Sequence, residues 1–300
     1  MKTLSRKQIL GYTAFSAAAG LLLAGMRAAV SMAYLEPGIE MYKHGTPLPA
    51  ILHTAIILCA IAVCSAGFCR LRDNTAADNT AAVSQFTTFT SMFSGFLLLA
   101  YDLYLIYEAA SSNWNAIGPL IGRLPTASVT MASAVFTLLL MILAIPAAIY
   151  FLKAAQGIAK PSLPFFATMT VVWLVLFALH AYFDASIAFN SPTKVLRILT
   201  VLALAIYAIH ETRRLLDIPM PRVYFPSAFL AVLLGLTHAI SDAVLLGTGK
   251  IKLQEGYLGI AVELAYVLYI LSRLLYLGTA KPQTDVLSDT APETEPTTES

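Results

Sequence analysis

The chain has 300 residues, of which 58% are hydrophobic and only 12% are charged, and its formal net charge is +2. Soluble domains carry about a quarter charged residues, so this composition excludes a soluble enzyme, a nucleic-acid-binding protein and a disordered chain. It is typical of a helical protein that crosses a membrane several times. The near-neutral net charge gives no reason to expect a strongly anionic partner.

Membrane spans are predicted from the length of the apolar segments. A helix needs about 20 mostly apolar residues to cross a hydrocarbon core of ~30 Å. Runs such as 138–149 and 201–209 are apolar on every face, which favours helices over the alternating strands of a barrel. The sequence therefore predicts an all-α, polytopic integral membrane protein with one transmembrane domain over residues 1–279. The expected spans are 9–34, 49–69, 86–108, 128–154, 164–189, 195–212, 226–247 and 256–277.

The distribution of Lys and Arg predicts the orientation, because these residues are enriched in cytoplasmic loops. With a cytoplasmic N-terminus, twelve of the 19 fall on the cytoplasmic side, six fall on the outer side and Arg27 falls within a span. This bias favours two cytoplasmic termini, an even number of spans and a location in the cell membrane. The first 25 residues also resemble a signal peptide, and its cleavage would leave seven spans.

Two segments outside the spans have low complexity. Residues 73–77 are repeated at 78–82, which is typical of a flexible connector. Residues 280–300 are rich in Thr, Pro and acidic residues, which predicts a disordered acidic cytoplasmic tail. Outside the spans, the sequence leaves no segment long enough for a soluble enzyme domain.

Ionisable side chains within spans are energetically costly and are therefore candidates for a functional site. Most lie near the midplane or in the outer half of their span. The exception is His210, beside Glu211, Arg213 and Arg214, where an interfacial position is expected. This asymmetry predicts a polar cavity that opens outward above an apolar inner plug. The candidates for binding a substrate or a proton are Arg27, His53, Asp102, His180, Asp184, His238, Asp242 and Glu263.

Two spans carry the same short motif, H-A-x-x-D-A, at residues 180–185 and 238–243. An Arg-Leu-Leu triplet follows each copy, beginning at Arg214 and Arg273. A duplicated two-helix hairpin, present as spans five and six and again as spans seven and eight, explains both similarities. Partial matches in spans one and three would extend the repeat to four hairpins.

The spacing within the motif has a chemical meaning. Residues four apart share one face of a helix, so His and Asp can hydrogen-bond to each other or bind one metal ion. Imidazole and carboxylate ligands suit zinc, iron or manganese, which makes a divalent metal the candidate cofactor. The candidate metal ligands are His180, Asp184, His238 and Asp242. Alternatively, these side chains act only as interhelical hydrogen-bond partners.

Three functions are compatible with this pattern. The favoured one is a transporter, or the membrane subunit of one, which couples a small solute or cation to protons. The alternatives are a membrane-embedded metal-dependent hydrolase and a non-catalytic sensor or assembly protein. The sequence contains no Walker motif and no H-E-x-x-H, which excludes an ATP-driven pump working alone. The lipid bilayer is the one partner that the sequence identifies.

Overall fold

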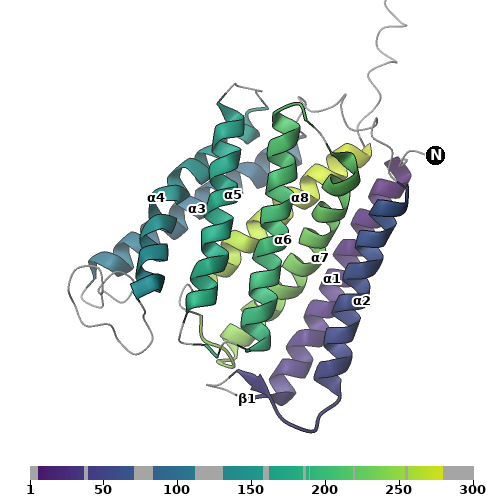
Figure 1. Cartoon of the computed structure of the whole chain (residues 1–300), viewed down its shortest axis with the longest axis vertical. Helices are drawn as coiled ribbons and strands as arrows, with labels where there is room; N and C mark the ends of the chain where they lie inside the picture. The colour runs from purple at the N-terminus through teal and green to yellow at the C-terminus, as the bar shows by residue number, and fades with distance from the viewer. Residues whose placement is uncertain are drawn as a thin grey trace, which may run out of the picture.

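A computed structural model describes residues 6–36, 40–70, 84–111, 131–157, 162–184, 187–188, 190–218, 220–253 and 256–279. Within these ranges it contains eight long helices and one two-stranded hairpin (Figure 1). The helices are α1 (Arg6–Tyr34), α2 (Leu48–Arg70), α3 (Gln85–Ala110), α4 (Met131–Ala155), α5 (Leu163–Phe183), α6 (Pro192–Leu215), α7 (Pro221–Gly247) and α8 (Gly256–Thr279). The strands are β1 (Leu35–Glu36) and β2 (Met41–Tyr42). The predicted connector at 73–82 and the predicted tail at 280–300 lie outside the described residues.

Each of the eight helices is long and apolar enough to cross a membrane, which confirms the predicted multi-pass class. The boundaries of α5 and α6 differ from the predicted ones. Helix α5 ends at Phe183, and α6 begins directly after Ser191 with Pro192 in its first turn, where proline fits the helical backbone. Lys194, which precedes the predicted span 195–212, therefore belongs to α6 together with Arg197.

The helices alternate in direction along the chain. The first and last described residues, Arg6 and Thr279, lie at one end of the bundle, which we call the terminal end (Figure 1). The β1–β2 hairpin lies at the opposite end, which we call the hairpin end. The side of the membrane on which each end lies stays a prediction.

Six helices form a closed ring in the order α3, α4, α5, α6, α7 and α8, because α8 packs back against α3. Helix α1 packs outside this ring against α7 and α8, and α2 packs against α7 and α1. Helix α7 therefore contacts α1, α2, α6 and α8 and is the most enclosed helix. On the outside of the bundle, large apolar side chains such as Leu22, Phe89 and Phe165 are exposed, as expected for a surface that faces lipid.

Glycines allow α7 to approach its neighbours closely. A Cβ atom added to Gly20 of α1 would lie 3.0 Å from the carbonyl oxygen of Leu233 on α7. A Cβ atom added to Gly235 of α7 would lie 2.2 Å from Val267 Cγ2 on α8. Small residues at such positions let helix backbones pack tightly in membranes. These contacts bring polar side chains of α1, α7 and α8 within reach of one another.

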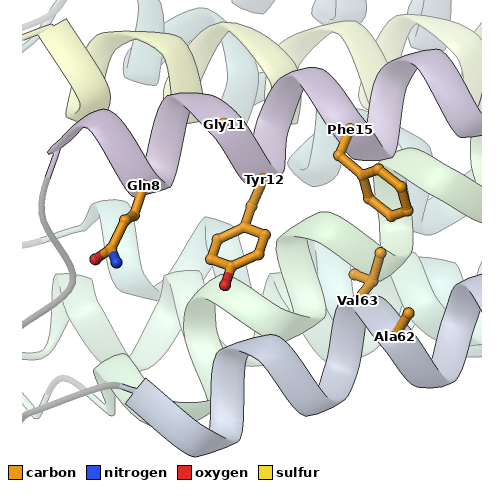
Figure 2. A pocket seen from close by; sticks show the side chains of 6 residues that line it. All are labelled: Gln8, Gly11, Tyr12, Phe15, Ala62 and Val63. Atoms are coloured by element: carbon orange, nitrogen blue, oxygen red, sulfur yellow. The ribbon is translucent and has the colours of Figure 1, made fainter.

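A groove of about 470 Å³ lies between α1 and α2 (Figure 2). It is mostly apolar and lies near the terminal end, far from Arg27 in the last two turns of α1. The groove is lined by Gln8, Gly11, Tyr12, Phe15, Ala62 and Val63. The groove is therefore not the polar cavity predicted from the sequence, because that cavity would open at the hairpin end. The polar cavity stays a prediction.

Candidate functional site

Buried ionisable side chains from four helices meet in the half of the bundle nearer the hairpin end. At their centre is His238 on α7, whose Nδ1 lies 2.8 Å from Glu263 Oε2 on α8. Its Nε2 lies 2.9 Å from Oδ2 of Asp242, one turn further along α7. All three side chains are buried. A neutral imidazole has a single N–H donor, so both contacts are hydrogen bonds only when the ring or one of the carboxyl groups carries an additional proton.

Each carboxylate is also paired with an arginine. Arg27 of α1 donates to Asp242 Oδ1 and to the hydroxyl of Ser241. Arg197 Nε of α6 lies 3.5 Å from Glu263 Oε1, and its guanidinium group lies over the Phe177 ring. Two arginines thus balance two carboxylates, as buried charges require. The residues Arg27, Arg197, His238, Asp242 and Glu263 are called the His238 network below.

The two copies of the H-A-x-x-D-A motif differ in local structure. In the second copy, His238 and Asp242 both lie within α7. In the first copy, Asp184 is the C-cap residue that follows the end of α5 at Phe183, and its backbone N–H donates to the carbonyl oxygen of His180. The Asp184 carbonyl oxygen accepts a hydrogen bond of 2.6 Å from Lys194 Nζ. The duplicated hairpin therefore stays a prediction.

The four candidate metal ligands come from helices that lie on opposite sides of α6. Helix α6 packs against both α5, which carries the buried His180, and α7, which carries His238. Among the residues that the structure describes, no group of three or more His, Cys, Asp or Glu side chains is arranged to hold a metal ion. The geometry of the described residues thus gives the predicted metal site no support.

The remaining candidates, Asp102 and His53, do not belong to the His238 network. Asp102 of α3 is buried, and within the described ranges its Oδ1 has no hydrogen-bond partner. His53 of α2 is exposed, and its ring packs against Tyr42 of β2 at a centroid distance of 5.8 Å.

Arg197 is not among the site residues predicted from the sequence, because it lies at the start of the predicted span 195–212 and is counted with the outer residues. The spacing of polar residues and tyrosine along α6 is a second signal that could have identified Arg197. Arg197, Thr200, Tyr207 and Glu211 follow one another at intervals of three, seven and four residues, which places them on one face of a helix. All four side chains are buried in the structure.

A second group of buried charges lies near the terminal end. Arg273 Nη2 of α8 lies 3.4 Å from Glu211 Oε1 of α6. Arg214 Nη1 lies 3.9 Å from Glu211 Oε2 and 3.3 Å from the Tyr224 hydroxyl of α7. These four residues are called the terminal cluster below, and the arginines of both Arg-Leu-Leu triplets converge in it.

The terminal cluster corrects one expectation. Glu211 and Arg214 are buried between helices near the terminal end, so the predicted apolar inner plug is wrong. The physical reason is the rotation of α6, which turns both side chains toward α7 and α8 and which hydropathy along the chain does not reveal. Tyrosines extend from this cluster toward the His238 network. The rings of Tyr207 and Tyr266 lie 6.3 Å apart, and the hydroxyls of Tyr150 and Tyr269 lie 3.1 Å apart.

The connection between α1 and α2 brings one more carboxylate to the hairpin end. Glu40 is buried, has a left-handed backbone conformation with φ of 54°, and accepts a hydrogen bond of 3.1 Å from the Lys252 backbone N–H. Burial raises the pKa of the Glu40 carboxyl above its ordinary value of 4.5. The Lys252 hydrogen bond lowers this pKa, and the charges of Asp242 and Asp184 raise it further.

Replacing Glu40 with Gln is expected to stabilise the protein at pH 7. A raised pKa means that the folded state favours the protonated carboxyl, so wild-type stability decreases as the pH rises above 4.5 toward the folded-state value. The neutral amide avoids this loss. Thermal unfolding should show a higher melting temperature for the variant at pH 7 and a difference that shrinks as the pH falls to 4.5.

The half-buried Glu36 on the same hairpin provides the matched control, since Glu36→Gln removes an equal charge. A Glu40→Gln variant that is less stable than wild type at pH 7 would show that the ionised carboxylate is needed by the fold.

No family model, no curated protein and no solved structure matches this chain. Its class therefore follows from its own architecture. Within the described ranges, eight apolar helices enclose paired charges and define a multi-pass helical membrane protein.

Proposed function

We propose that this protein is a proton-dependent membrane transporter, or the membrane subunit of one, for a small solute or cation. One observation carries the proposal: His238 lies between two buried carboxylates, and each carboxylate also holds an arginine from another helix. A proton at this position can reside on the imidazole or on either carboxyl group.

The arrangement links the position of a proton to the contacts between helices. Asp242 connects α7 to α1 through Arg27, and Glu263 connects α8 to α6 through Arg197. When a proton moves from His238 to one of these carboxylates, the carboxyl group becomes neutral and its attraction to the paired arginine weakens. Protonation thus changes the relative stability of different helix arrangements, and this difference is what coupling to a solute requires.

Side chains capable of proton exchange continue beyond the network. Tyr207 and Tyr266 lie between Glu263 and Glu211 along α6 and α8. Because a tyrosine hydroxyl both donates and accepts hydrogen bonds, these residues support a proton route toward the terminal end. A purely structural role needs only one charged partner for each charged side chain, whereas His238 contacts two carboxylates.

The test is solute-dependent proton movement in reconstituted vesicles. The purified full chain is placed in vesicles that contain a pH-sensitive dye, and a potassium diffusion potential is imposed with valinomycin. Small ions and neutral solutes are then added one at a time. We expect at least one of them to change the internal pH in wild-type vesicles, and we expect His238→Gln to reduce this rate at least tenfold, because the amide cannot exchange the proton.

The exposed His44 provides the control, since His44→Gln removes an imidazole outside the spans and should leave the rate unchanged. Equal thermal unfolding of the variants and the wild type shows that they are folded. The proposal is wrong if no solute in the panel moves protons, or if folded His238→Gln protein transports at the wild-type rate.

A further inference from the structure

The two charged groups differ in the balance between arginines and carboxylates. In the His238 network, two arginines face two carboxylates, the imidazole contacts are 2.8 and 2.9 Å long, and the contact between Arg197 and Glu263 is 3.5 Å long. In the terminal cluster, two arginines face the single carboxylate of Glu211, and the contacts span 3.3 to 3.9 Å. Charge-assisted hydrogen bonds are normally about 2.7–2.9 Å long. Among the residues that the structure describes, the terminal cluster therefore has an excess positive charge, and its contacts are long.

Three guanidinium donors of the terminal cluster are left over. Arg214 Nε, Arg214 Nη2 and Arg273 Nε are buried and have no hydrogen-bond partner in the part of the chain that the structure describes. Arginine stays protonated in proteins, so these donors cannot be neutralised by loss of a proton. Leaving them without an acceptor in an apolar surrounding is costly. An anion with several acceptor oxygens would satisfy both the donors and the charge.

The geometry of Arg214 indicates which kind of anion fits. Its Nη1 faces Tyr224 and Glu211, whereas Nε and Nη2, on the opposite edge of the guanidinium group, are the donors without a partner. This edge presents two parallel N–H groups, the fork that binds two oxygens of a phosphate. Arg273 likewise contacts Glu211 through Nη2, whereas its Nε has no hydrogen-bond partner among the described residues. A tetrahedral oxyanion has enough oxygens to accept from both arginines.

The terminal cluster lies close to the ends of its helices. Arg214 lies in the last turn of α6, and Tyr224 lies in the first turn of α7. Both are at the terminal end, where membrane-spanning helices reach the lipid headgroups and the water beyond them.

We propose that Arg214 and Arg273 bind a phosphate-type oxyanion at the terminal end, with the Tyr224 hydroxyl holding Arg214 in position. The oxyanion is either inorganic phosphate or the phosphate of a lipid headgroup. This site requires neither proton transfer nor transport, so it stands or falls independently of the proposed function.

The experiment separates the two sources. Delipidated full-length protein in detergent is titrated with inorganic phosphate, with chloride at the same ionic strength as the reference, and thermal unfolding is followed. In parallel, native mass spectrometry measures how much phosphatidylglycerol stays bound after purification. Saturable stabilisation by phosphate, or retention of about one lipid per chain, identifies the source.

Either signal should weaken at least tenfold in Arg214→Gln and Arg273→Gln. Arg214→Lys keeps the charge but loses the fork, and we expect it to remain folded while binding several-fold more weakly. Arg222→Gln removes an exposed charge at the same end and should bind like wild type. The proposal is overturned if folded wild-type protein shows neither signal, or if Arg214→Lys and Arg214→Gln both bind as wild type does.

Discussion

Replacing Arg27 with Met should lower the free energy of unfolding by about 3–5 kcal/mol, because removing one partner leaves a buried charge without compensation. The charge in question is the carboxylate of Asp242, which is 0% exposed and accepts from Arg27. Ser241 loses the same donor. Unfolding of the purified protein in mixed micelles, followed by circular dichroism as denaturing detergent is added, measures the effect.

A double variant separates the lost ion pair from the lost packing. Arg27→Met combined with Asp242→Asn removes both charges and keeps similar side-chain volumes, so it should recover much of the stability. Lys43→Met, which removes an exposed positive charge after β2, should leave stability unchanged. Equal destabilisation by the single and the double variant would show that the Arg27–Asp242 charge interaction contributes nothing.

Replacing Gly235 with Ala should destabilise the protein by about 1–3 kcal/mol, the usual cost of inserting a methyl group into a packed interface. The new Cβ would lie only 2.2 Å from Val267 Cγ2, so α7 and α8 must separate or Val267 must rotate. Valine has one strongly preferred rotamer in a helix, so rotation is costly. The same movement would disturb the contact between His238 and Glu263. The unfolding assay described for Arg27 measures this effect.

Two further variants test the steric explanation. Adding Val267→Ala removes the clashing methyl group and should restore stability to the Gly235→Ala protein. Gly25→Ala on α1 is the matched control, because nothing lies within 4 Å of its added Cβ. We expect that control to be neutral or to gain about 0.5–1 kcal/mol from helix propensity. A loss in Gly25→Ala as large as that in Gly235→Ala would contradict close α7–α8 packing as the cause.

The sequence predicted part of the candidate site. Arg27, His238, Asp242 and Glu263 are recognisable as ionisable residues within apolar spans, and the structure brings all four together. Arg197 was missed because it lies at the start of the predicted span 195–212, where its charge is counted with those of the outer residues. The sequence predicted an interfacial position only for His210 and did not predict that the neighbouring Glu211 and Arg214 are buried, because their burial depends on which face of α6 meets α7 and α8.

The class of this protein follows from its amino-acid sequence alone, because the need for a long apolar segment to cross a bilayer is a local property of the chain. The sequence also shows which half of each span carries most of the candidate residues. Which of these residues meet depends on the packing of the helices. Helix α6 packs between α5 and α7, which carry the two copies of the repeated motif. His238 on α7 therefore pairs with Glu263 of α8 and not with the first copy of the motif. The order and rotation of packed helices depend on contacts between distant segments, and these contacts do not appear in the pattern of any single span.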